Sequence, residues 1–450
     1  MIVLPTSTCA LSDRQLAKLT QIERAFALSP QQLAAIVKSI HAKLFQGLHQ
    51  NDNSCELPMT PTFVHQRTQP AGVSLGMAIE ATGRRIRISS FTFAKHPTKN
   101  PSSTQVFVTP PAALKSAATL FEYTAYCLRE FIQSRHLDSP QTAMPLGITI
   151  GLPVSGSSVS EQPKEDSLDL CGKNIARQLY DTFLRCHLPV RLTSFTNSTV
   201  SSLIASRHQH KDTKIAASFN HGINAAYFEP LANVKTLSPS TVSDGAEEKY
   251  VAVDTEIGRY TLLPLTQWDR RVDRESKHPG TRTLEKMIAD RYLGELVRNL
   301  ITDFIDERLL FVKADTRAIS VEYSFHTAYM ASIMESESAV DAIFAAEFGI
   351  SFVFPADCQL VRALCELVAK RAAQLAAAML AALVLKTRPC DSKPTVVALS
   401  GVLFDINQRL YDHSVMVLKS LLADKAALVE IQLHPRGTEV FGAAVNAASI

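Results

Sequence analysis

Apolar and polar positions along the chain follow two different periods. Residues 12–50 carry apolar side chains three and four positions apart, which predicts two helices, and Ser29-Pro30 is a typical start for the second one. Residues 73–94 instead alternate apolar and polar side chains, which predicts strands. A continuous apolar run, PLGITIGLPV at residues 145–154, is typical of a buried strand.

The remaining chain shows the same mixture of periods. Helical spacing predicts helices over 112–133, 168–187 and 283–311, and over most of the tail from residue 359. Apolar runs predict strands at 214–228, 250–257 and 395–400, and polar stretches predict loops at 157–167 and 236–248. Because strands and helices mix throughout, the predicted fold class is α/β.

Length and composition limit the class of protein. A chain of 450 residues is too long for one simple core, so two domains are expected. With 46% apolar residues, 20% charged residues and a net charge of +3, the chain has no electrostatic basis for binding nucleic acid or an anionic membrane directly. The most apolar segment, residues 372–385, is shorter than the roughly 20 residues that a membrane span needs, so we interpret it as a buried helix.

Cysteine usage and the N-terminal sequence point to a compartment. The eight cysteines form no C-x-x-C pair, which argues against a zinc site or a disulfide framework and favours a reducing compartment. The N-terminal sequence MIVLPTSTCALSDRQ has no basic region and its apolar run ends at Pro5, so no signal peptide is predicted. We therefore expect a cytoplasmic protein, with a nuclear location left open.

One predicted strand-to-helix turn lacks the side chains that usually carry out catalysis. The stretch SFTNSTVSSLIA, residues 194–205, ends a strand-like run at Thr196-Asn197-Ser198-Thr199 and then continues with helical spacing. Enzymes of the α/β class often display reactive groups where a strand ends and a helix begins. This turn carries only hydroxyls and one amide, and it has no carboxylate, histidine or thiol.

Four segments, in order over nearly the whole chain, resemble the eukaryotic hexokinase family. They are LPMTPTFV (57–64), PLGITIGLPVS (145–155), LPLTQWDRRVDRESKHPGTRTLEKMIADRYLGELVRNLI (263–301) and VRALCELVAKRAAQLAAAMLAAL (361–383). The resemblance implies the actin-like ATPase (ribonuclease H-like) hexokinase fold, in which two α/β domains face each other across a central cleft that holds the nucleotide. It implies a small domain at 71–196 plus 437–450 and a large domain at 1–70 plus 197–436.

The family's catalytic base is absent from the turn. The family pattern there is L-x-N-D-T-V-G-T-L, whose aspartate binds the sugar and accepts a proton from the attacking hydroxyl. Ser198 occupies that position in this chain. A neutral hydroxyl cannot act as the base near pH 7, and losing a general base typically costs about 10²–10⁴ in rate.

The phosphate-binding segments are also altered relative to the family. The pattern D-x-G-G-T-N-x-R falls on residues 80–87, where Glu80 could reach a magnesium ion and only Gly83 and Arg87 match strictly. The pattern G-T-G-T-N-A keeps Gly222 and Asn224, and D-G-S-V-Y keeps Gly401 but loses its aspartate. Near the C-terminus, D-G-S-G-x-G-A-A is reduced to Arg436-Gly437-Thr438-Glu439 and Gly442-Ala443-Ala444. Fewer glycines leave less room for backbone N–H groups to meet phosphate.

The sugar-binding positions match the family better. The resemblance assigns sugar contacts to Ser155, Asn197, Glu256 and Glu285, the last two from the N-x-E-W-G and EKM patterns. The W-T-K-G-F segment, expected around 159–170, has no counterpart there. Each unmatched sugar hydroxyl forgoes on the order of 0.5–1.5 kcal/mol, so weaker hexose binding is expected.

Structural explanations compete with the functional ones. Gly222 could be present because its turn needs positive φ, and Asn224 because it caps a turn. Glu285 could simply be part of a solvated helix start. The pair His208 and His210 fits an exposed loop better than a metal site, so no metal ligands are predicted.

Two functions remain open from the sequence. The leading interpretation is a catalytically inactive hexokinase-like regulatory or sugar-sensing protein, which binds a hexose, acts through an unknown protein partner, and needs Mg-ATP only if the altered loops still bind it. The alternative is an active, atypical ATP-dependent hexokinase that phosphorylates the 6-hydroxyl of glucose or a related hexose. In that case Asp254 or Glu256 would supply the base.

Overall fold

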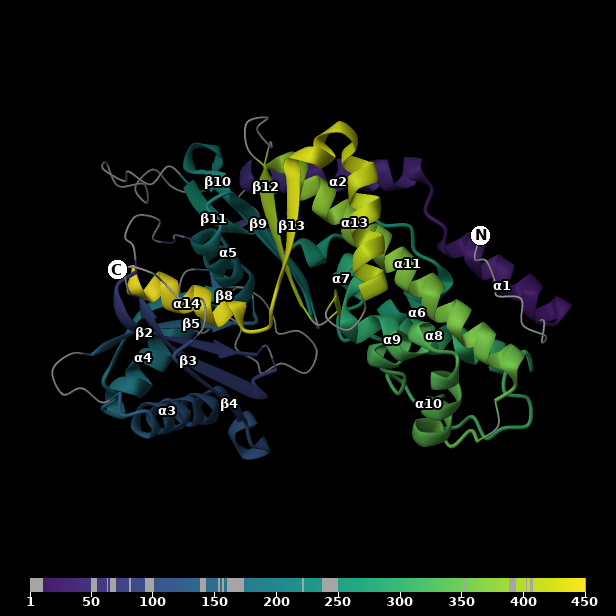
Figure 1. The fold of residues 1–450 in the computed structure, drawn as a ribbon, viewed down its shortest axis with the longest axis horizontal. Helices are drawn as coiled ribbons and strands as arrows, with labels where there is room; N and C mark the ends of the chain where they lie inside the picture. Colours follow the sequence, from purple (N-terminus) through teal and green to yellow (C-terminus); the bar gives the residue numbers. More distant parts are fainter. Residues whose placement is uncertain are drawn as a thin grey trace.

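The fold is seen in a computed structural model, drawn in Figure 1. It describes residues 11–49, 55–62, 64, 70–80, 82–93, 101–137, 143–152, 154–155, 158–159, 174–220, 222–236, 250–351, 353–387, 394–401, 403–404 and 408–449. Two larger sheets, each with its own helices, organise this part of the chain. A two-stranded ribbon pairs β6 (Val154–Ser155) with β7 (Ser158–Val159).

The smaller sheet has five strands in the order β4-β3-β2-β5-β8. These are β4 (Ser103–Val108), β3 (Arg85–Phe93), β2 (Gly72–Ile79), β5 (Met144–Ile150) and β8 (Val190–Asn197). Strands β2, β5 and β8 run parallel, and β2, β3 and β4 form an antiparallel meander. Helices α3 (Ala117–Ser134) and α4 (Ile175–Arg185) bury their apolar residues with this sheet in one core.

The larger sheet has six strands in the order β1-β11-β10-β9-β12-β13. These are β1 (Thr60–Thr62), β11 (Tyr250–Asp254), β10 (Ile223–Pro230), β9 (Thr213–Phe219), β12 (Thr395–Ser400) and β13 (Val429–His434). Helices α1 (Asp13–Phe26), α2 (Pro30–His49), α11 (Pro355–Lys386) and α13 (Gln408–Leu422) accompany it in the chain's main core. Only α11, among the described residues, has the length and hydropathy to cross a membrane, and 89% of its most apolar window is buried inside the protein.

Two helices lie between the sheets and share a core with both. Helix α5 (Ser198–Gln209) packs on the larger sheet, and α14 (Thr438–Ala448) packs on α5 and on the smaller sheet, where it is the yellow helix ending at the C-terminus in Figure 1. Ser74 donates a hydrogen bond to the Ala444 carbonyl, and Asn446 donates to Ser194. Because α5 begins where β8 ends, the turn at Ser198 lies where the two halves of the molecule meet.

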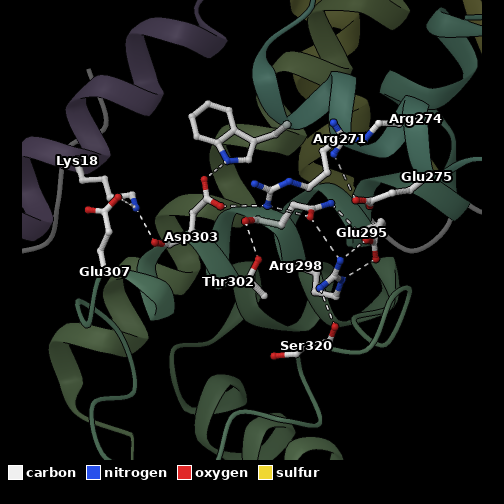
Figure 2. A network of polar contacts seen from close by, with 12 residues as sticks. Lys18, Arg271, Arg274, Glu275, Glu295, Arg298, Thr302, Asp303, Glu307 and Ser320 are labelled. Carbon is white, nitrogen blue, oxygen red and sulfur yellow. Dashed lines mark hydrogen bonds and ion pairs between the residues drawn. The ribbon is translucent and has the colours of Figure 1, made fainter. Parts of the chain in front are cut away.

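A polar network joins three helices of the main core (Figure 2). Helix α8 (Asp290–Asp306) presents Asp303, which accepts hydrogen bonds from Trp268 of α6 (Gln267–Glu275) at 2.7 Å and from Arg271 at 3.1 Å. Lys18 of α1 donates to the Asp303 carbonyl at 2.6 Å. The short helix α7 (Thr283–Ile288) lies between α6 and α8 in the chain and packs on both of them.

Two predicted elements are divided in the structure. The strand predicted at 214–228 is a hairpin of β9 and β10, closed by a hydrogen bond from the Asn220 N–H to the Gly222 carbonyl. The helix predicted at 283–311 breaks at Ala289, which is extended, because the Asp290 N–H donates to the Asn220 carbonyl instead of continuing the helix.

Other predicted elements are confirmed, with some omissions. The helices at the N-terminus, the strands within 73–94 and the strand at 395–400 appear as α1, α2, β2, β3 and β12. The sequence did not predict β4, β13, α9 (Thr327–Glu335) or α10 (Ser338–Phe348). Most of the two predicted polar loops, and the start of the helix predicted at 168–187, lie outside the described residues.

Candidate functional site

The turn that lacks an acid is a strand-to-helix junction, as predicted. Asn197 ends β8 and caps α5, because its Oδ1 accepts a hydrogen bond from the Val200 N–H at 2.7 Å. Ser198 is the first residue of α5 and is half-buried. A hydroxyl at this helix N-terminus is well placed to donate or accept a hydrogen bond, but it carries no negative charge.

A carboxylate from another strand contacts this turn. The Asn197 amide donates a hydrogen bond to Oδ2 of Asp254, the last residue of β11, and the Asn224 amide donates to Oδ1 at 2.7 Å. Asp254 is only 1% exposed. The N-x-E-W-G pattern has asparagine at this position, so the chain has lost one acid at Ser198 and gained another that contacts Asn197.

Two glutamates and an arginine extend this cluster. Glu256 Oε1 accepts a hydrogen bond from Asn224 at 2.8 Å, and Glu285 Oε2 accepts one from the Ile223 N–H at 3.0 Å. Nη1 of Arg282 lies 3.6 Å from Glu256 and 3.8 Å from Glu285. We call Asn197, Asn224, Asp254, Glu256, Arg282 and Glu285 the carboxylate cluster.

The cluster joins three of the four predicted sugar contacts. Asn197, Glu256 and Glu285 all belong to it. The fourth, Ser155, lies in β6, and its side chain is outside the described residues. The segment 160–170, where a counterpart to W-T-K-G-F was sought, is also outside them.

Three competing structural explanations are wrong. Asn224 does not cap a turn: it lies in β10 and donates to Asp254 and Glu256. Glu285 is not solvated, being 2% exposed. His208 is not in an exposed loop: it lies in α5 and contacts Phe93 and Phe441, and the described residues contain no potential metal cluster of three or more His, Cys, Asp or Glu.

Sequence reasoning weighed Asp254 only as one of two substitute bases, and it overlooked Arg282. The asparagine-to-aspartate change in N-x-E-W-G was a readable signal for Asp254. Nothing in the sequence marked Arg282, because its position is open in the PG-x-x-x-x-EKMI pattern.

The predicted nucleotide residues fall on three separate segments. Glu80 and Gly83 form the turn of the β2–β3 hairpin, where Gly83 has φ +69° and its N–H donates to the Glu80 carbonyl. Gly401 follows β12, and a Cβ there would lie 2.1 Å from the Phe219 carbonyl oxygen, so close packing on β9 explains this glycine. Gly222 lies in the β9–β10 turn, directly before Ile223, the first residue of β10.

A cavity of about 610 Å³ lies between β3, which carries the predicted nucleotide residue Arg87, and the loop before α14. Arg87 of β3 reaches the loop before α14, with its Nη1 3.6 Å from where a Cβ on Gly437 would be. The lining includes Arg87, Arg436, His210 and His434 and contains no Asp or Glu among the described residues. Such a lining suits an anionic ligand.

The Glu439 carboxyl would compete with a bound anion for Arg87. It lies in the first turn of α14, where backbone N–H groups favour a negative charge. Burial raises the pKa of the Glu439 carboxyl above its ordinary value, while backbone N–H groups, including that of Gly437, and Arg87 oppose this rise. A phosphate group near Arg87 would therefore have to share it with this carboxylate.

Comparison with known proteins gives a consistent result. Sequence profiles described as hexokinase match residues 18–208 and 214–449. The chain is 29% identical over 395 residues to Hexokinase-2 of Candida albicans, covering 84% of this chain and 80% of that one. It is 27% identical over 383 residues to Hexokinase-1 of Saccharomyces cerevisiae, covering 81% of this chain and 78% of that one.

Solved structures confirm the predicted fold. A hexokinase from Schistosoma mansoni complexed with glucose superposes with a TM-score of 0.85 at 24% identity, over 97% of this chain and 99% of that one. A second hexokinase crystal structure gives a TM-score of 0.79 at 22% identity, over 97% of this chain and 100% of that one.

Proposed function

Because the chain belongs to the hexokinase family, we propose that it binds a hexose at the carboxylate cluster and phosphorylates the hexose 6-hydroxyl with ATP, using Asp254 as the base. The observation that carries this proposal is the hydrogen bond from Asn197 to Asp254, next to Ser198. A general base must lie within hydrogen-bonding reach of the proton it removes, and this carboxylate contacts the turn where the family's base stands.

Hexose is the ligand class that fits the cluster. Its three carboxylates accept hydrogen bonds, and its two asparagines both donate and accept, which suits a ring of neutral hydroxyls. The Schistosoma mansoni hexokinase structure is a complex with glucose, which supports the same class for this chain.

ATP would bind on the Arg87 side. The cavity there has cationic walls that suit phosphates, and Arg87 and Arg436 are the residues that would hold them. Magnesium, when bound with ATP, would neutralise charge on the transferring phosphoryl group, and Glu80 is the predicted residue for it. We expect weak nucleotide binding, because Glu439 competes for Arg87.

A second candidate is the non-catalytic sugar sensor or regulator favoured by the sequence. Two observations support it: Ser198 is uncharged, and the Glu439 carboxyl lies close enough to Arg87 to interact with it electrostatically. In this case a hexose would bind without turnover, and the protein would act through a protein partner in the cytoplasm or nucleus. The carboxylate cluster would then serve binding alone.

One set of measurements separates the two candidates. Isothermal titration calorimetry with glucose, with and without Mg-ATP, measures binding, and a coupled assay for ADP release measures turnover. Asp254→Asn should abolish hexose-dependent turnover, whereas the matched surface variant Asp315→Asn, which alters an exposed ion pair with Arg317, should not.

Each outcome decides between the candidates. Turnover that survives Asp254→Asn would refute Asp254 as the base. Glucose binding without turnover, not restored by Ser198→Asp, would support the sensor. Absence of binding by glucose and other hexoses would refute both.

A further inference from the structure

Arg282 lies between the two glutamates of the carboxylate cluster. Its side chain is 11% exposed, and those of Glu256 and Glu285 are 5% and 3% exposed. Arg282 is the residue before α7 and has φ +55°, and Glu256, opposite it, has φ +47°. Left-handed backbone is costly for residues other than glycine and persists only where the surroundings impose it.

Two buried carboxylates that face the same point need a counter-charge. Like charges that share a site raise the pKa of one partner, so that one carboxyl takes up a proton. Burial alone would lower the pKa of the Arg282 guanidinium, but Glu285 and Glu256 outweigh burial and the pKa is raised. The reciprocal effect of the guanidinium favours the ionised form of both carboxylates.

We propose that Arg282 is a positioning residue for hexose binding, which keeps Glu256 and Glu285 ionised and side by side so that both accept hydrogen bonds from sugar hydroxyls. The inference rests on the proposed hexose site, and it deepens that proposal by assigning the site's charge balance to a residue whose position is open in the family pattern. A protonated carboxyl would offer the sugar a donor where an acceptor is needed.

Other charged groups around Arg282 define what its removal would leave. Arg259, in the 3-10 turn Ile257–Arg259, is close enough to Arg282 for the two cations to repel each other, and Arg282 contributes to lowering the pKa of Arg259 after burial does. Tyr292 of α8 also faces Arg282. Asp254 adds a third carboxylate, connected to Glu256 through the Asn224 amide. Without Arg282, three acids would share the cluster, and Arg259 would remain as a nearby cation.

The test compares the full-length protein with Arg282→Gln and Arg282→Lys between pH 5.5 and 8. Glucose affinity is measured by calorimetry, and Glu side chains labelled with carbon-13 report their own protonation by NMR. The wild-type protein should bind glucose with a nearly constant Kd. In Arg282→Gln, one glutamate should titrate within this range, and Kd should rise by about tenfold for each pH unit below its new pKa.

The two variants and a control separate positioning from folding. Arg282→Lys keeps the charge and should restore most of the flat pH profile, although it cannot reproduce the planar guanidinium. Arg317→Gln, at an exposed ion pair, should behave as the wild type. A variant that merely weakened the fold would change affinity equally at every pH.

The results distinguish this inference from the proposed function. A flat Kd in Arg282→Gln, with no glutamate titrating, would overturn the role of Arg282 while leaving the hexose site intact. If the wild-type protein bound no hexose at any pH, the hexose site and the positioning role would both be wrong, and the NMR titration would still show whether Arg282 controls the two carboxyls.

Discussion

Relative to the family pattern, the chain lacks an acid at position 198 and has one at position 254, and mutation can reverse both changes. Asp254→Asn replaces a carboxylate that accepts hydrogen bonds from the buried amide of Asn197 and the half-buried amide of Asn224. An asparagine there has one acceptor oxygen in place of two, so one of the two hydrogen bonds to position 254 is lost. A hydrogen bond to a charged group contributes about 1.5–3 kcal/mol, and we expect a loss of stability of this size. Loss of the base should also lower turnover by about 10²–10⁴.

The double variant Ser198→Asp/Asp254→Asn restores the family arrangement. Ser198→Asp alone adds a fourth carboxylate to a buried, acidic region and should destabilise the protein, whereas the double variant removes that repulsion. We therefore expect the double variant to be more stable than the sum of the single changes predicts, by about 0.5–3 kcal/mol, the usual range for contacting residues. Its turnover should match or exceed that of the wild type.

The assay uses the chain's single tryptophan. Trp268 is buried in the larger core and its indole donates to Asp303, so its fluorescence reports unfolding of that core in urea. Turnover is followed in parallel by ADP release. Additive stabilities for the two single variants would show that positions 198 and 254 do not interact, and would refute the argument that one acid replaces the other.

Two further predictions concern the nucleotide side and the core. Glu439→Ser should strengthen Mg-ATP binding by roughly fivefold, because a carboxyl group near a helix N-terminus that also interacts with Arg87 contributes on the order of 1 kcal/mol, and unchanged affinity in calorimetry would contradict this. Arg371→Ala should destabilise the larger core by about 3–5 kcal/mol, because it leaves Asp269 buried without the guanidinium that lies 2.6 Å away, and a change no larger than that of the exposed Arg317→Ala would refute this.

Local sequence was enough for many of the elements and for the missing acid. Helical spacing placed α1 and α2, alternation placed β2 and β3, and the turn at Asn197-Ser198 could be identified as a strand-to-helix junction. These features depend on neighbours in the chain, and their periods survive in any tertiary context. The breaks at 220–222 and at Ala289 could not be seen, because a hydrogen bond between distant segments creates the second of them.

Only the tertiary structure decided which acid faces the turn. Asn197 ends a strand of the smaller sheet and Asp254 ends a strand of the larger one, so their contact depends on how the two sheets meet around α5. Antiparallel pairing of β10 with β11 brings Asn224 beside Asp254, and α7 brings Arg282 between two glutamates. The sequence by itself determined that position 198 has no charge. The packing of the two sheets determined that a carboxylate lies next to it, because sequence period sets the face of an element but not the partner that covers it.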